Sequence, residues 1–213
     1  KGLSEVKLED SQARIYCHRH PDGAWLPGGA SNAGGEIFRR RFGERLPELE
    51  ATARGRDGTD HLVYPSIRRG ERLPFAEDSF EPFFVGREED EVGVFLACVE
   101  GVSFVEALIY ELIESLGGVV GENLFATGGA TLSLLGLEVR AAVLQKRIRV
   151  PAHPNSAMGA AILAAAGFHE EPVGKWSSRM VRILRTIEPS DSRMSYYRDR
   201  LAIFREHCYQ GLP

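Results

Sequence analysis

Apolar side chains recur at helical spacing in the second half of this chain. The longest such stretch covers residues 92–116, with apolar positions at Phe95, Val99, Val102, Val105, Ile109, Leu112 and Leu116. Residues three and four apart share one face of a helix, and the pair Gly117-Gly118 supplies an end signal. We therefore predict a long apolar helix that packs against a sheet. Further helices are predicted at 131–144, at the Ala-rich stretch 155–167, where Gly167 is the expected end, and at 190–209.

The first half of the chain contains shorter elements. Residues 13–18 and 25–27 are predicted strands of a hairpin, because the turn-forming sequence Pro21-Asp22-Gly23 lies between them. A helix is expected to begin at Ser31 or Asn32, since either side chain can cap it.

Strands and helices alternate from residue 120 onward, which is typical of a parallel α/β layer. Residues 55–60 are polar and glycine-rich, which predicts a loop, and the prolines within 65–84 argue against a helix there. With 213 residues, 43% of them hydrophobic and 26% charged, the chain has the size and composition of one globular domain.

The turn at Gly128-Gly129 is the clearest candidate for chemistry. An apolar strand ends at Phe125, two adjacent glycines follow, and the predicted helix begins at Thr131. Glycines let the backbone approach a ligand closely because no Cβ lies in the way. We expect the helix to direct unpaired amide groups and a partial positive charge at that ligand. A nucleotide suits such a turn, and a tight turn that only packs the helix on the sheet accounts for the spacing equally well.

Three further motifs accompany this turn. They are the glycine-rich segment 25–35, the sequence Gly-Glu-Arg-Leu-Pro at 70–74, and the Glu-Gly pair at 100–101 within the long helix. Together, in this order, they resemble the C-terminal domain of the FGGY family of sugar kinases, which includes xylulokinase, ribulokinase and glycerol kinase. Residues 70–74 are most similar to the xylulokinase and D-ribulokinase branch, whereas Gly93 and Cys98 depart from the family's pattern.

The resemblance implies an α/β architecture. It is the actin-like ATPase fold, with an RNase-H-like mixed sheet flanked by helices and missing its first strand or strands. Residues 1–213 would form the C-terminal nucleotide-binding domain, and the N-terminal sugar-binding domain would lie outside this sequence.

The same resemblance implies an ATP-dependent carbohydrate kinase. The full protein would transfer the γ-phosphate to a hydroxyl of a ketose or polyol, with xylulose and ribulose favoured. Two turns would contact the nucleotide. Gly128, Gly129 and Ala130 would form the wall against adenosine, with the Ser133 hydroxyl one helical turn on. Gly35 and Arg39 would approach from the other side, although Arg39 stands where glycerol kinases have an uncharged polar residue.

ATP and Mg²⁺ are therefore the expected cofactors. The implied partners are ATP and a sugar held by the N-terminal domain, and a homodimer is left open. No aspartate of this chain lies in the glycine-rich setting of the family's catalytic base, so we expect that base in the N-terminal part and no catalytic or metal-binding residue here. The isolated chain is accordingly expected to be inactive.

Charge and composition exclude several other classes. A net charge of −4 argues against a nucleic-acid surface, and we find no apolar stretch of about 20 residues that predicts a membrane span. The three unclustered cysteines suit a reducing compartment, so the cytoplasm is the expected location.

Rival motifs fail on spacing. No P-loop or dinucleotide fingerprint is present in the sequence. His18 and His20, next to Cys17, share a strand face, but the sequence offers no third or fourth metal ligand nearby. Two alternatives to a kinase stay open at this point: a non-catalytic actin-like domain that senses nucleotide or mediates assembly, and a structural domain whose glycines serve packing.

Overall fold

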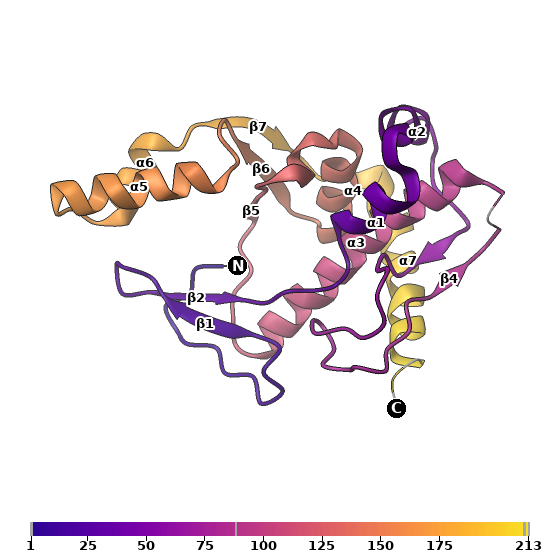
Figure 1. Cartoon of the computed structure of the whole chain (residues 1–213), viewed down its shortest axis with the longest axis horizontal. Helices are drawn as coiled ribbons and strands as arrows, with labels where there is room; N and C mark the ends of the chain where they lie inside the picture. Colours follow the sequence, from indigo (N-terminus) through magenta and orange to yellow (C-terminus); the bar gives the residue numbers. More distant parts are fainter. Residues whose placement is uncertain (1, 88, 211, 213) are drawn as a thin grey trace.

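The computed structural model describes residues 2–87, 89–210 and 212. Figure 1 shows the elements in space. The strands are β1 (Tyr16–Arg19), β2 (Trp25–Gly28), β3 (Leu62–Val63), β4 (Phe84–Val85), β5 (Asn123–Phe125), β6 (Arg147–Pro151) and β7 (Ile183–Ile187). The helices are α1 (Gly35–Phe42), α2 (Leu46–Ala53), α3 (Glu91–Ser115), α4 (Leu134–Leu144), α5 (Ser156–His169), α6 (Val173–Met180) and α7 (Asp191–Gln210), with 3₁₀ turns η1 (Gly43–Arg45) and η2 (Gly129–Leu132).

The three-stranded sheet has the order β5-β6-β7. β5 and β6 are parallel, with Leu124 opposite Ile148, as predicted for the layer after residue 120. β7 is antiparallel to β6, with Ile187 opposite Ile148, so the sheet is mixed. A small apolar cluster lies between this sheet and α4. It consists of Ala126, Leu137, Ala141, Ile148 and Val150. The β1–β2 hairpin is also confirmed, with Cys17 opposite Pro27.

The main core surrounds α3, which confirms the long apolar helix. Phe104 of this helix packs against the rings of Tyr197 and Phe204 on α7, at centroid distances of 6.4 Å and 5.3 Å. One part of the sequence reading needs correction, because α3 is long and apolar enough to cross a membrane by length and composition. However, 78% of its most apolar window is buried inside the fold, which is the burial of a core helix.

The helix expected at Ser31 or Asn32 begins only at Gly35, which was wrong by three to four residues. Both polar side chains have a distant partner instead. Ser31 Oγ donates to Oε2 of the buried Glu71 at 2.8 Å, and Asn32 donates its backbone N–H to Oε1 at 2.8 Å and its side-chain amide to the Gly70 carbonyl. The segment before α1 is therefore held by the loop at 70–74.

Glu71 is a buried carboxylate surrounded by donors, and its removal is expected to destabilise the protein strongly. Oε1 accepts from the N–H groups of Asn32 and Arg72, and Oε2 accepts from the hydroxyls of Ser31 and Tyr64. Glu71→Ala leaves these donors unpaired, which should cost about 3 kcal/mol or more. Glu71→Gln should cost about 1 kcal/mol, because its carbonyl oxygen still serves the N–H groups while both hydroxyls can turn to accept. Urea denaturation of both variants measures this difference, and equal losses would contradict it.

Helices α5 and α6 form an arm that projects from the rest of the chain (Figure 1). Asn155 caps the N-terminus of α5, because its side-chain oxygen accepts a hydrogen bond from Met158 N at 3.1 Å. Asparagine is one of the preferred residues at this position. The helix continues past the predicted end at Gly167 to His169, because Glu170 takes the left-handed conformation that ends it. Asp22, in the β1–β2 turn, accepts from the N–H groups of Val173 and Gly174 at 2.9 Å and 2.8 Å, which ties the start of α6 to the hairpin.

Candidate functional site

The turn after β5 leaves its backbone open to the surroundings. Gly128 has a φ of 76°, a conformation that favours glycine, and its N–H donates to the Pro154 carbonyl at 2.6 Å. A Cβ built on Gly128 or on Gly129 meets nothing within 4 Å. Gly129 has neither a positive φ nor a packing neighbour that requires glycine.

The start of α4 differs from the expectation. The predicted helix begins at Leu134 rather than at Thr131, after the 3₁₀ turn η2. Its first amides are not unpaired: Gly136 N donates to Ser133 Oγ at 2.9 Å, and Leu135 N donates to Glu50 Oε1 at 3.2 Å. A carboxylate of this chain thus occupies the position where we expected a ligand's negative charge.

Ser133 has a smaller capacity for a ligand than the sequence suggested. Its hydroxyl donates to Glu50 Oε1 at 3.1 Å while it accepts from Gly136 N. A hydroxyl has one proton and two lone pairs, so one acceptor position is left. Contact between Ser133 and a nucleotide stays a prediction, and within this arrangement it is limited to accepting a hydrogen bond.

Helix α1 carries the other two predicted residues. A Cβ on Gly35 meets nothing within 4 Å, and no side chain caps the helix at Gly34. Arg39 is exposed, and its guanidinium forms no ion pair or hydrogen bond with another described residue. Its neighbours are engaged, since Arg40 pairs with Glu36 at 3.0 Å and Arg41 lies over the Phe84 ring. The predicted residues therefore form two sets, one in the glycine turn and one on α1.

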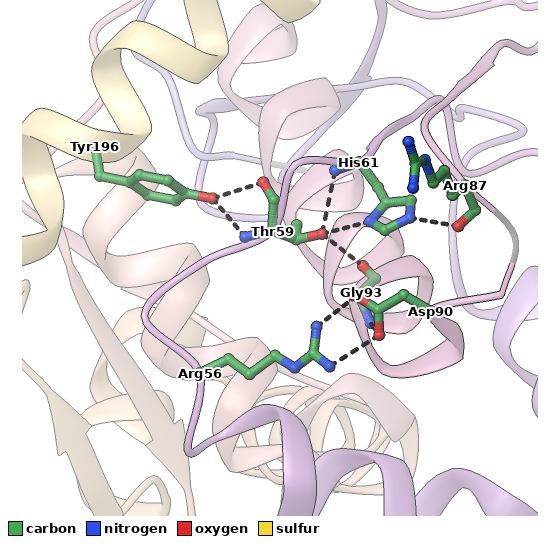
Figure 2. A network of polar contacts seen from close by, with 7 residues as sticks. All are labelled: Arg56, Thr59, His61, Arg87, Asp90, Gly93 and Tyr196. Carbon is green, nitrogen blue, oxygen red and sulfur yellow. Dashed lines mark hydrogen bonds and ion pairs between the residues drawn. The ribbon is translucent and has the colours of Figure 1, made fainter.

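A second polar cluster joins the loop at 56–61 to α3 and α7, and sequence reasoning did not predict it (Figure 2). Thr59 N–H donates to the Tyr196 hydroxyl at 2.9 Å, and Thr59 Oγ1 lies 2.8 Å from His61 Nδ1. His61 Nε2 lies 2.5 Å from the Arg87 carbonyl, and Arg56 pairs with Asp90 at 2.5 Å and 2.8 Å. Long sequence separations, 137 residues from Thr59 to Tyr196, hide these pairings from local patterns.

The same cluster explains why glycine occupies position 93. A Cβ at Gly93 would lie 2.8 Å from His61 Nδ1, and one at Gly86 would collide with the other side of that ring. The buried imidazole fills the space that a polar side chain at 93 would take.

Glu100, the acidic member of the Glu-Gly pair, lies beneath this cluster with its side chain fully buried. Its Oε2 pairs with Arg200 Nε at 2.8 Å, and its Oε1 lies 3.2 Å from the Tyr196 hydroxyl. Burial raises the pKa of Glu100 to about 7, and Arg200 opposes that shift. Its oxygens are engaged by α7, so we assign Glu100 to the support of the fold.

The Cys-His-Arg-His segment is engaged in local contacts. Cys17 Sγ lies 3.4 Å from the Leu8 carbonyl, and His20 Nδ1 accepts from Asp22 N at 3.1 Å. Across residues 2–87, 89–210 and 212, no three His, Cys, Asp or Glu side chains are grouped so that they would hold a metal ion.

Comparisons with known proteins identify the family. The model of the C-terminal domain of the FGGY family of carbohydrate kinases matches residues 17–168. The gluconokinase of Bacillus licheniformis is 24% identical over 215 residues, which cover 92% of this chain and 42% of that protein. The gluconokinase of Bacillus subtilis (strain 168) is 26% identical over 174 residues, 72% of this chain and 34% of that protein.

Solved structures agree on the fold. The xylulose kinase of Rhodospirillum rubrum, 25% identical, aligns with a TM-score of 0.77 over 93% of this chain and 42% of its own. The ligand-bound xylulose kinase of Lactobacillus acidophilus, 18% identical, aligns with a TM-score of 0.79 over 96% of this chain and 44% of its own. The Plasmodium falciparum glycerol kinase with ADP, 15% identical, aligns with a TM-score of 0.72 over 89% of this chain and 39% of its own.

The chain belongs to the FGGY family of carbohydrate kinases and has the actin-like ATPase fold of that family's C-terminal domain. It spans less than half the length of the curated relatives it matches. Sugar kinases of this family use ATP and typically Mg²⁺. The elements α6, β7 and α7 lie beyond the residues that the family model matches.

Proposed function

We propose that this chain is the nucleotide-binding part of an ATP-dependent carbohydrate kinase that phosphorylates a ketose or polyol, with xylulose or ribulose as the favoured acceptor. The observation that carries the proposal is the open turn at Gly128-Gly129, where a Cβ built on either glycine meets nothing within 4 Å. The family match supports the reaction class. The similarity of residues 70–74 to the xylulokinase and D-ribulokinase branch supports xylulose or ribulose as the acceptor. The relatives and similar structures are named as gluconate, xylulose and glycerol kinases.

The residues present fit an adenosine better than a phosphate at this turn. Glu50 already neutralises the start of α4, so an uncharged part of the ligand suits Gly128, Gly129 and Ala130. Anionic groups are better placed near Gly35 and the unpaired Arg39, because guanidinium groups bind phosphate well. When bound, ATP supplies the phosphoryl group, and this chain orients it. The general base and the sugar contacts are assigned to the remainder of the kinase.

Gly129→Val tests the proposal. The branched side chain should occupy the space against which the nucleotide lies and weaken ATP binding at least 100-fold, a change of about 2.7 kcal/mol. Folding should be maintained, because the new Cβ meets nothing within 4 Å. Isothermal titration with ATP, with and without Mg²⁺, measures the dissociation constant.

Gly121→Val is the matched control, because a Cβ at Gly121 also meets nothing within 4 Å and lies outside the turn. Its dissociation constant for ATP should match that of the unaltered protein. An unchanged dissociation constant in Gly129→Val would show that these glycines serve only the turn itself.

A further inference from the structure

Glu50, on α2, contacts the residues directly after the glycine turn. Its Oε1 accepts from Ser133 Oγ at 3.1 Å and from Leu135 N at 3.2 Å, across 83 and 85 residues of sequence. On its other side, α2 continues through η1 into α1, which begins with Gly35. One half-buried carboxylate therefore spans from the α1–α2 segment to the residues directly after the glycine turn.

We propose that Glu50 is a positioning residue of the nucleotide site: it holds the turn at 128–133 in register with α1. The inference rests on the proposed function, since it concerns the same site. Glu50 would act through Ser133 and the first turn of α4, and not by touching the nucleotide.

The turn has few other supports. Gly128 N–H is bound by Pro154, and Thr131 Oγ1 donates back to the Gly128 carbonyl at 2.7 Å, which stabilises the turn internally. Leu132 is 88% exposed, so apolar packing contributes little there. The buried residues of α2, Leu49 and Ala53, belong to the core around α3. The same core includes Leu135 of α4, so apolar packing holds the two helices together, and the Glu50 hydrogen bonds add a directional link at the start of α4.

A second pair between the same helices provides a matched comparison. Arg54 donates to Glu138 at 3.1 Å, with both side chains substantially exposed. This ion pair reaches the second turn of α4 and leaves the helix start untouched. Exposed pairs of this kind contribute little, whereas the Glu50 oxygen accepts directional hydrogen bonds in the first turn of α4. Loss of Arg54 should therefore leave the turn in place.

Two substitutions separate the reach of Glu50 from its charge. Glu50→Asp keeps the charge but shortens the side chain by one methylene, so both contacts are lost. Glu50→Gln keeps the length and an oxygen that accepts from Leu135 N and Ser133 Oγ. We expect ATP binding to weaken about tenfold in Glu50→Asp, because binding must then order the turn. Glu50→Gln and Arg54→Met should stay within about twofold of the unaltered protein.

Amide hydrogen exchange gives a readout that needs no nucleotide. The amides of Leu135 and Gly136 are hydrogen-bonded at the helix start, and their exchange should accelerate at least tenfold in Glu50→Asp but not in Arg54→Met. A purely electrostatic role would give the reverse order for binding, with Glu50→Gln altered and Glu50→Asp normal, and would overturn the proposal.

The two proposals fail differently. If the unaltered chain binds no ATP, the proposed function fails, and the exchange rates alone decide the positioning role: acceleration in Glu50→Asp supports it, and unchanged rates overturn it. If the unaltered chain binds ATP and Glu50→Asp binds equally well, the nucleotide site stands and the role of Glu50 is overturned.

Discussion

Replacing Gly101 with alanine is expected to destabilise the protein by about 3 kcal/mol or more. Gly101 lies on α3 where this helix crosses the segment that follows β3. A Cβ there would lie well inside 3.0 Å of the Val63 carbonyl oxygen and at 3.0 Å from Pro65 Cδ. The obstacle is a backbone carbonyl of the buried residue Val63, which pairs with Phe84 in the β3–β4 ladder, so it cannot rotate away. The whole helix would have to shift from its core neighbours.

Gly159→Ala makes the same chemical change with the opposite expected sign. Gly159 lies within α5, is exposed, and a Cβ there meets nothing within 4 Å. Alanine should stabilise that helix by up to about 1 kcal/mol because glycine is a poor helix former. Urea denaturation of both variants gives the two free energies of unfolding. A small loss in Gly101→Ala would show that α3 has room at this crossing.

Arg200→Met is expected to cost about 3–5 kcal/mol at alkaline pH, because it leaves the Glu100 carboxylate buried without its counter-ion. Arg200 also donates to the His61 carbonyl, so the loop at 56–61 loses an anchor. The double variant Glu100→Gln/Arg200→Met removes both charges. It should recover most of the stability, and a double variant as weak as Arg200→Met would contradict the assignment of the loss to an unpaired charge.

The loss should depend on pH in a defined direction. Burial raises the pKa of Glu100 from 4.5 to about 7, so the folded protein binds this proton more tightly than the unfolded chain does. The contribution of Glu100 to stability therefore falls as pH rises from about 4.5 to about 7. Without Arg200 the pKa should rise further, so the penalty in Arg200→Met is expected to be smaller at pH 5 than at pH 8. Denaturation at both pH values checks the sign.

Local periodicity predicted the elements that one helix or one turn specifies by itself. The long helix α3 and the hairpin around Pro21-Asp22-Gly23 are both confirmed. Elements whose form depends on distant partners were missed. Helix α2 and strand β7 were not predicted, and β7 is defined by its pairing with β6. Ser31 and Asn32 carry a capping signal, but Glu71 accepts their hydrogen bonds.

The candidate site shows the same division. The sequence singles out Gly128 and Gly129, and the structure adds the reason that they are open. Nothing in the spacing of Ser133 indicates that its proton belongs to Glu50, 83 residues earlier. A signal existed in retrospect, since Ser133 and Gly136 have the spacing of a helix cap. That Glu50 supplies the carboxylate bound to this cap could be seen only in the folded structure.

The hydrogen bonds from α6 to Asp22 determine how freely the arm can turn. The arm of α5 and α6 is joined to the sheet by the β6–α5 connection and by the step from α6 into β7. With only these two attachments, the arm could still rotate about the line that joins them. Asp22, contributed by the hairpin, provides a third point of attachment at the start of α6. The hydrogen bonds of one carboxylate thereby restrict rotation of the arm relative to the hairpin.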